Sequence, residues 1–227
     1  MDKKPKKAKV TIKVLAVLGI TMLLALTFIV LYVNRSNQPK NLYPSEIRNY
    51  QGENLSSISD VFEKTIHGLQ YINDTTYRLA VTGLVDKNLS LSYSEVLNDF
   101  QSYKKVVTIH CVEGWSATIL WEGFLVSDLL KEAGADPNAT TVIFRASDGY
   151  STALPTEYLK NHNILIAYKM NNITMPPERG FPFELVAESQ YGYKWIKWLT
   201  SVEISNNSTY LGFWESRGYP NNATAFP

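Results

Sequence analysis

The chain's single cysteine stands in Val106-Val107-Thr108-Ile109-His110-Cys111-Val112-Glu113-Gly114-Trp115. The β-branched and apolar residues up to Ile109 predict a buried strand, and the Glu113-Gly114 pair predicts the turn that ends it. Binding and catalytic side chains are concentrated on the loops that follow such strands. This stretch is therefore the first candidate for a functional site.

Three interpretations of Cys111 stay open on this stretch alone. A lone cysteine after a strand is commonly a small buried apolar residue. A nucleophile is less favoured, because His110 and Cys111 point to opposite faces of a strand and no cysteine-protease signature surrounds them. The third interpretation is a thiolate ligand to a soft metal centre.

The N-terminal segment predicts a membrane anchor. Residues 14–33 form a 20-residue run without a charged side chain, long enough to cross a bilayer as a transmembrane helix. Residues 1–13 carry six lysines against Asp2, and this excess predicts that the N-terminus is cytoplasmic. A cleaved signal peptide is the alternative, but the run is longer than its usual apolar region and no small-x-small site follows. We therefore expect a single-pass protein of the cell membrane with an extracytoplasmic C-terminal domain.

Composition narrows the class of partner. The formal net charge is +1 and residues 1–13 contribute +5, so the rest of the chain carries −4. Without a basic field, no nucleic-acid binding is expected.

The single cysteine indicates an external domain that does not rely on disulfides. Nine Asn-x-Ser/Thr acceptors, against about 2.5 expected by chance, predict a glycoprotein and hence an archaeal or eukaryotic surface protein.

The chain after the anchor divides into a tether, one domain and a tail. Residues 34–70 are polar and proline-containing, and predict a tether that ends in one short helix. Residues 71–215 suffice for one core, and residues 216–227 form the tail. We expect strands at 77–85, 106–109, 115–121, 141–145, 164–168, 183–186 and 197–204, and short helices at 94–100, 127–134 and 155–160. Short strands with isolated helices predict an α+β fold with mixed sheets.

Three further segments carry residues that core packing does not explain. They are Asp148 to Pro155, Arg179 to Leu185 and Gln190 to Leu199. The third interleaves a glycine and two lysines with aromatic residues, for which an amphipathic strand with lysines on its exposed face is the alternative.

Together with Cys111, these segments resemble the sulfite oxidase-like family of molybdenum-molybdopterin oxidoreductases over nearly all of residues 71–214. His-Cys-Val-Glu-Gly-Trp resembles the family's molybdenum-ligating cysteine motif, Tyr150 to Pro155 resembles the segment that brings a tyrosine to the metal, and Gly192 to Leu199 resembles the pterin-phosphate segment. The resemblance implies a sulfite oxidase-type molybdopterin-binding domain and a molybdenum-molybdopterin cofactor. The chain contains no second redox motif, so an external electron-transfer partner, a cytochrome or a membrane redox protein, is implied as well.

The resemblance also implies roles for individual residues. Cys111 becomes the metal ligand and, with Tyr150 and Arg179, part of the catalytic set. Lys194 and the backbone amides of the glycine and tyrosine before it would hold the pterin phosphate. The full cofactor-binding set comprises His110, Cys111, Ser147, Gly192, Tyr193, Lys194 and Lys197.

The chain departs from the family at positions that bear on the substrate. Residues 112–120 contain no arginine, Glu184 stands where relatives carry arginine, and Glu188-Ser189 replace a Pro-Gly pair. These changes remove cations that would hold an oxyanion. We therefore expect two-electron oxygen-atom transfer with a small-molecule oxo donor or acceptor, a sulfoxide-like compound being favoured over sulfite. The alternatives are a non-catalytic binding domain that keeps the molybdopterin fold and, less favoured, a cysteine-dependent hydrolase.

Overall fold

The computed structural model describes residues 18–29 and 43–225, and the chain divides into two compact units, Met1–Lys40 and Asn41–Pro227. In the first unit, residues 18–29 are helical. Within the described residues, no helix combines the length and the apolar character needed to cross a membrane. The other residues of the anchor predicted at 14–33 lie outside the described part of the chain.

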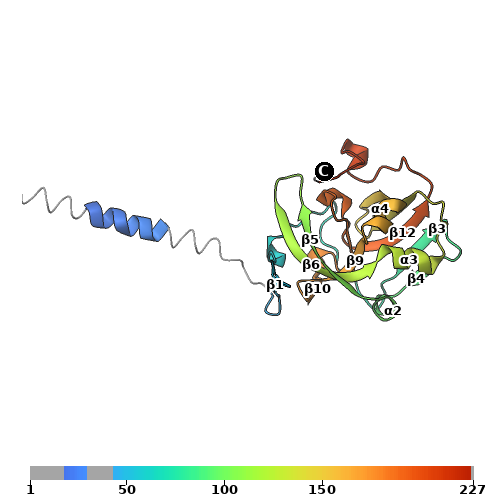
Figure 1. Ribbon diagram of the computed structural model, residues 1–227, viewed down its shortest axis with the longest axis horizontal. Coiled ribbons are helices and arrows are strands. Elements are labelled where there is room, and N and C mark those ends of the chain that lie inside the picture. The colour runs from blue at the N-terminus through green and yellow to red at the C-terminus, as the bar shows by residue number, and fades with distance from the viewer. Residues whose placement is uncertain (1–17, 30–42, 226–227) are drawn as a thin grey trace, which may run out of the picture. The chain divides into compact units, whose positions relative to one another are not determined.

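The second unit is built on two five-stranded sheets (Figure 1). The first has the order β10-β9-β6-β5, with β11 also paired to β9, and the second has the order β4-β3-β12-β7-β8. Strands of the first sheet are β5 (Tyr103–His110), β6 (Ser116–Leu125), β9 (Leu165–Met170), β10 (Ile173–Thr174) and β11 (Glu184–Val186). Strands of the second are β3 (Leu79–Gly83), β4 (Leu89–Leu91), β7 (Thr141–Ala146), β8 (Ser151–Pro155) and β12 (Leu199–Ser205). Because β12 pairs parallel to β3 and antiparallel to β7, the mixed α+β architecture expected from the sequence is confirmed.

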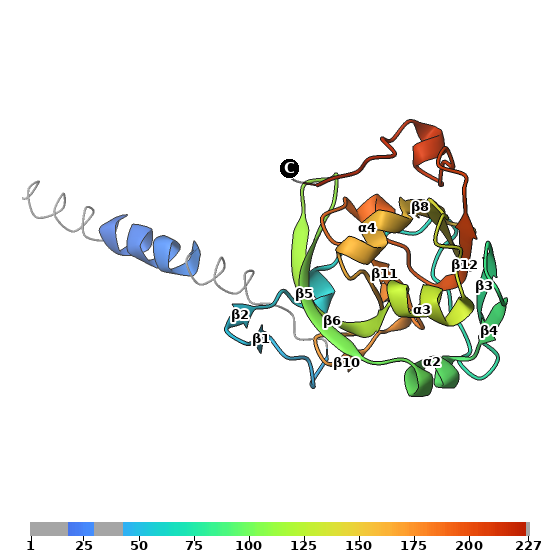
Figure 2. The same cartoon turned by 45° about the vertical axis from the view of Figure 1, so that its right-hand side comes forward.

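The helices of this unit are short. They are α2 (Tyr93–Asp99), α3 (Val126–Ala133) and α4 (Thr156–Asn161). In both views, α3 and α4 lie between the β5–β6 hairpin on one side and β3 with β4 on the other (Figure 2). The hydrophobic core lies between these helices and strands. It includes Trp121, Phe124, Phe144 and Phe183, all fully buried.

Local sequence explains where two of the helices begin and end. Ser92 caps α2, because its hydroxyl accepts from the Glu95 amide while the Glu95 carboxylate accepts from the Ser92 amide. The helix predicted at 94–100 therefore begins one residue earlier, at Tyr93, directly after the serine that has a glutamate three positions on. Gly134 ends α3 with φ 64°, in the left-handed region where glycine has no steric cost.

The predicted strand at 106–109 is the second half of β5, which forms a long hairpin with β6. Their register runs from Tyr103 opposite Gly123 to His110 opposite Ser116. At the tip, the Cys111 amide donates to the Trp115 carbonyl at 2.9 Å, and the Gly114 amide donates to the Cys111 carbonyl at 3.0 Å. Cys111 is therefore the first residue of the tight connection that follows β5.

The structure differs from the tether expected at 34–70, because the described residues of that range pack into the domain. They form β1 (Asn49–Tyr50), β2 (Glu53–Asn54) and a 3-10 turn, η1 (Ile58–Asp60), in which Ile58 is fully buried. The buried Glu46 carboxylate accepts from the Ile58 amide at 2.7 Å and from Asn171 Nδ2 at 2.9 Å. Buried polar bonds hold this segment, so apolar periodicity could not have predicted its position.

Candidate active site

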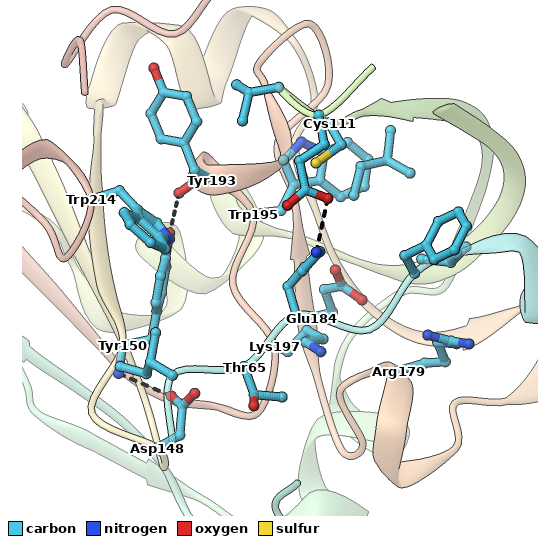
Figure 3. A pocket seen from close by; sticks show the side chains of 18 of the residues that line it. Thr65, Cys111, Asp148, Tyr150, Arg179, Glu184, Tyr193, Trp195, Lys197 and Trp214 are labelled. Carbon is cyan, nitrogen blue, oxygen red and sulfur yellow. Dashed lines mark hydrogen bonds and ion pairs between the residues drawn. The ribbon is translucent and has the colours of Figure 1, made fainter. Parts of the chain in front are cut away.

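A cavity of about 260 Å³ opens at the tip of the β5–β6 hairpin. Segments far apart in the sequence line it: residues 61–66, residues 109–115, the turn between β7 and β8, residues 178–184, residues 192–198, and the C-terminal side chains Trp214 and Tyr219. Figure 3 shows the labelled side chains converging on this space from several elements. The three segments singled out in the sequence are thus brought together with Cys111.

Cys111 presents a free, partly exposed thiol to the cavity, beside Trp195 (Figure 3). The bridge between His110 and Tyr191 joins the end of β5 to the 3-10 turn η3 (Gly192–Lys194). Across residues 18–29 and 43–225, no three His, Cys, Asp or Glu side chains are grouped to hold a metal ion. Cys111 is therefore suited to be the one protein ligand of a metal that a cofactor carries, a role in which a soft thiolate is effective.

Tyr150 is held rigidly at the cavity wall. Its hydroxyl donates to the Tyr193 carbonyl at 2.5 Å, and its amide donates to Asp148 Oδ1 at 3.0 Å. Burial raises the pKa of the Tyr150 phenol far above its usual value, with nearby acidic groups adding to the effect. The hydroxyl therefore stays protonated at neutral pH and its orientation is fixed.

Arg179, at the end of η2 (Pro177–Arg179), has hydrogen-bond donors left unused. Its Nε and Nη1 are buried and, within the described residues, have no hydrogen-bond partner. Leaving buried charged donors unpaired costs more than leaving neutral ones. Since Arg179 lines the cavity, its guanidinium can donate hydrogen bonds to an oxygen of a ligand bound there.

Two further charged side chains, Glu184 and Lys197, lie beside Arg179 (Figure 3). Glu184 is 5% exposed, and burial raises the pKa of its carboxyl to about 8 although Lys197 and Arg179 act to lower it. Burial lowers the pKa of the Lys197 ammonium, which Glu184 opposes. The Lys197 nitrogen lies 4.3 Å from the centre of the Trp198 ring, within the range of a cation–π interaction.

Several residues predicted from the sequence do line the cavity: Cys111, Tyr150, Arg179, Gly192, Tyr193 and Lys197. His110 instead lines a second hollow, which shares Cys111 and is bounded by residues 219–224. Ser147 is exposed in the turn between β7 and β8, and its amide donates to the Trp198 carbonyl at 3.0 Å. The structure thus does not bring Ser147 into the cavity.

The structure places Lys194, predicted to hold the pterin phosphate, away from the cavity and bonded to other groups of the protein. The side chain is fully buried, and its ammonium donates to Glu215 Oε1 at 2.6 Å, Asn221 Oδ1 at 2.8 Å and the Ala153 carbonyl at 3.0 Å. These three bonds use all the donors of an ammonium group. Lys194 does not line the cavity, and it ties η3 to β8 and to the C-terminal residues.

Part of the cavity wall was not predicted from the sequence. Residues 61–66 fell in the expected tether, and Trp214 was not assigned to the site. Lys64 joins Glu113 at the mouth by a 2.8 Å ion pair between exposed side chains, and Phe62 lies 5.5 Å from Trp115, centre to centre. Three apolar residues in six are too few to set a period, so the segment gives no signal for such contacts.

The comparisons with known proteins agree with this geometry. The family model named Oxidoreductase molybdopterin binding domain matches residues 67–214, and the chain belongs to this family. It is therefore a molybdenum-dependent oxidoreductase of the sulfite oxidase-like kind, and its cofactor is molybdenum-molybdopterin. The thiol of Cys111 and the unpaired donors of Arg179 fit such a group.

Three named proteins are similar to this chain. It is 36% identical over 150 residues to the oxidoreductase YuiH of Bacillus subtilis, covering 66% of this chain and 75% of that protein. It is 30% identical over 152 residues to the protein-methionine-sulfoxide reductase catalytic subunit MsrP of Gluconobacter oxydans, covering 60% of this chain and 49% of that protein. The sulfane dehydrogenase SoxCD of Paracoccus pantotrophus shares the fold, with a TM-score of 0.61 at 22% identity over 63% of this chain and 42% of that chain.

Proposed function

We propose that the chain is a membrane-anchored, extracytoplasmic enzyme that transfers an oxygen atom in a two-electron reaction, with a sulfoxide-like substrate preferred to sulfite. The observation that carries this proposal is the cavity in which the Cys111 thiol and the unpaired donors of Arg179 line the same space. A sulfoxide oxygen is a strong hydrogen-bond acceptor on an uncharged molecule, so one guanidinium is enough to bind it.

When bound, the molybdenum-molybdopterin cofactor supplies the metal at which an oxygen atom and two electrons are exchanged. In this chain, the Cys111 thiolate would ligate that metal. Gly192, Tyr193 and Lys197 line the same cavity and would contact the pterin, while Trp195 and Trp214 offer aromatic walls that exclude water.

The other polar residues would position the substrate. Arg179 would donate to its oxygen, because Nε and Nη1 have no other acceptor within the described residues. The Tyr150 hydroxyl is committed to the Tyr193 carbonyl and stays protonated, so it shapes the wall and does not serve as a base. No strong general base is required for transfer of an oxygen atom that carries no proton.

The relatives support the proposed substrate class. MsrP of Gluconobacter oxydans and MsrP of Campylobacter jejuni are both named protein-methionine-sulfoxide reductase catalytic subunits. The chain spans about half the length of these relatives, 49% and 60%, so their substrate is carried over here as part of the proposal. An external electron carrier, a cytochrome or a membrane redox protein, would complete the reaction.

The test compares substrates on the purified full chain loaded with cofactor, with an artificial electron carrier. We expect a higher kcat/KM for a sulfoxide than for sulfite, and a loss of roughly a hundredfold to a thousandfold in turnover for Cys111→Ala, the size of effect that one oriented group contributes. Leu97→Ala, on the exposed side of α2, is the control and should keep full turnover. Full turnover without molybdenum would refute the mechanism, and a higher specificity constant for sulfite would refute the substrate.

The proposed location rests on the uncharged run at 14–33 and the lysine-rich segment before it. Deleting residues 1–33 should release the protein from the membrane fraction. Protease added to intact cells should remove the domain of the full chain. If the domain were protected in intact cells and digested only after lysis, the orientation would be wrong.

A further inference from the structure

Glu184 is an unusual side chain for its position. It opens β11, all of whose residues are buried, and pairs with Ala167 of β9. Burying a carboxylate is costly unless cations or hydrogen bonds compensate it. The compensation comes from the cavity, where Lys197 and Arg179 both act electrostatically on Glu184.

The backbone brings Glu184 and Lys197 together at Gly180, which has φ 110°. A Cβ atom built there would lie 3.1 Å from the Lys197 Cβ and 3.3 Å from the Glu184 Cβ, so both side chains leave the backbone against this glycine. Arg179 precedes it directly in the chain. Glu184 and Lys197 thus lie together in the cavity wall, and Arg179 lies to one side of them and acts electrostatically on both (Figure 3). We call this part of the cavity the Arg179 end.

The other charged side chains that line the cavity already have partners. Lys64 and Glu113 pair with each other, Glu178 accepts from the Tyr43 hydroxyl at 2.5 Å, and Asp148 accepts from the Tyr150 amide. Glu63 and Asp148 also act electrostatically on Lys197. Glu184 differs from these carboxylates in being buried on a strand, and it acts electrostatically on both Lys197 and Arg179.

We propose that Glu184 is a specificity-determining residue, whose carboxylate, when ionised, cancels one positive charge at the Arg179 end and thereby favours uncharged oxo compounds over small dianionic ones. This inference deepens the proposed function and rests on it. With Glu184 ionised, the cluster holds at most a net charge of +1, which suits a dipolar oxygen. Without the carboxylate, two cations would converge on one space, which is the arrangement that binds oxyanions.

The test measures anion binding without turnover, on the purified full chain. Sulfate is the probe, binding is followed by calorimetry at low ionic strength, and the pH is 8.5, where a carboxyl with a pKa of about 8 is mostly ionised. A higher pH is avoided because burial lowers the pKa of the Lys197 ammonium. We expect Glu184→Gln to bind sulfate about tenfold more tightly than the wild type, the effect of removing one charge at short range in a partly screened site. Dimethyl sulfoxide binding should change less than about threefold, since its interaction with a point charge is weaker.

Two further variants keep the result interpretable. Glu184→Leu removes the charge with an apolar side chain suited to a buried strand, and should reproduce the sulfate effect if Glu184→Gln folds poorly. Glu178→Gln makes the same formal charge change in the same cavity, but at a carboxylate already held by Tyr43. It should change sulfate affinity less than about threefold.

Unchanged sulfate affinity in both Glu184 variants would overturn the assignment, and so would an equal rise in Glu178→Gln. Failure of the loaded enzyme to reduce sulfoxides would instead remove the proposed function while leaving the anion-binding result standing. In the loaded enzyme, the ratio of kcat/KM for sulfite to that for a sulfoxide should rise in Glu184→Gln.

Discussion

Lys194 and Lys197 are three residues apart in one segment, yet they lie in opposite kinds of environment. The Lys194 ammonium has three oxygen acceptors and is sealed from solvent and from the cavity. Lys197 lines the cavity, lies over the Trp198 ring, and makes one long 3.5 Å hydrogen bond to the Glu178 carbonyl. The donors of the Lys194 ammonium are thus all used by protein acceptors, whereas the Lys197 ammonium can still interact with a ligand in the cavity.

The difference follows from the backbone between the two lysines. Lys194 ends the 3-10 turn η3, and Trp195 follows in an extended conformation, with φ −83° and ψ 146°. This change of conformation means that residues three apart no longer share a face, as they would in a continuous helix. Trp198 has φ 54°, a conformation that bulky residues rarely adopt, and this turns the chain again before β12.

The largest expected effect comes from breaking the buried pair at Lys194. Lys194→Met leaves Glu215 fully buried without its cation, and removing one partner of a buried ion pair costs about 3 to 5 kcal/mol. Urea unfolding of the full chain measures this loss. Lys194→Met combined with Glu215→Leu should recover most of it, because no buried charge then remains unpaired. A loss under about 1 kcal/mol in the single variant would show that the pair is not buried in solution.

The same two lysines show what the sequence could and could not predict. The strand before Cys111, the glycine that ends α3 and the grouping of the three segments around the cysteine were all predictable, since they depend on local periodicity and on motif order. The different environments of Lys194 and Lys197 were not predictable. They depend on Glu215 and Asn221, which lie in the C-terminal residues and accept hydrogen bonds from Lys194. The segment at 61–66 was missed for a similar reason, since its contacts are long-range.

The second prediction concerns how the Glu184 carboxyl, which interacts electrostatically with Lys197, makes stability depend on pH. The pKa of its carboxyl is about 8 in the folded protein and about 4.5 in an unperturbed side chain. Between these values the folded state keeps a proton that the unfolded chain releases, so this group's contribution to stability is complete below pH 4.5 and is lost as the pH rises to 8. This pKa already includes the effect of the cations at Lys197 and Arg179, so we expect the free energy of unfolding to fall by up to about 4 kcal/mol between pH 5 and pH 8.5.

Comparing variants isolates this contribution. In Glu184→Gln the side chain cannot titrate, so the free energy of unfolding should fall less between pH 5 and pH 8.5 than in the wild type. Glu178→Gln is the control and should keep the wild-type pH dependence. Parallel curves for Glu184→Gln and the wild type would mean that the carboxyl of Glu184 is ionised throughout and pairs tightly with Lys197.

The smallest expected change in stability separates the two lysines most clearly. In Lys197→Met, the cation–π contact with Trp198 is lost, a contribution of about 0.5 to 1 kcal/mol, and the cost of desolvating the ammonium is removed. Glu184 can take up a proton and so does not remain as an unpaired buried charge. The free energy of unfolding at pH 7 should therefore change by less than about 1 kcal/mol, well below the loss in Lys194→Met.

For sulfate binding, unlike for stability, a change at Lys197 should have a larger effect than a change next to Lys194. On a Glu184→Gln background at pH 7, adding Lys197→Met should weaken sulfate binding about tenfold, because it removes a cation that faces the cavity. Asn221→Ala takes away one acceptor of Lys194 outside the cavity, and should leave sulfate affinity within about threefold of the background. If Asn221→Ala weakened sulfate binding as much as Lys197→Met, Lys194 would be reaching the ligand after all, and the contrast between the two lysines would not hold in solution.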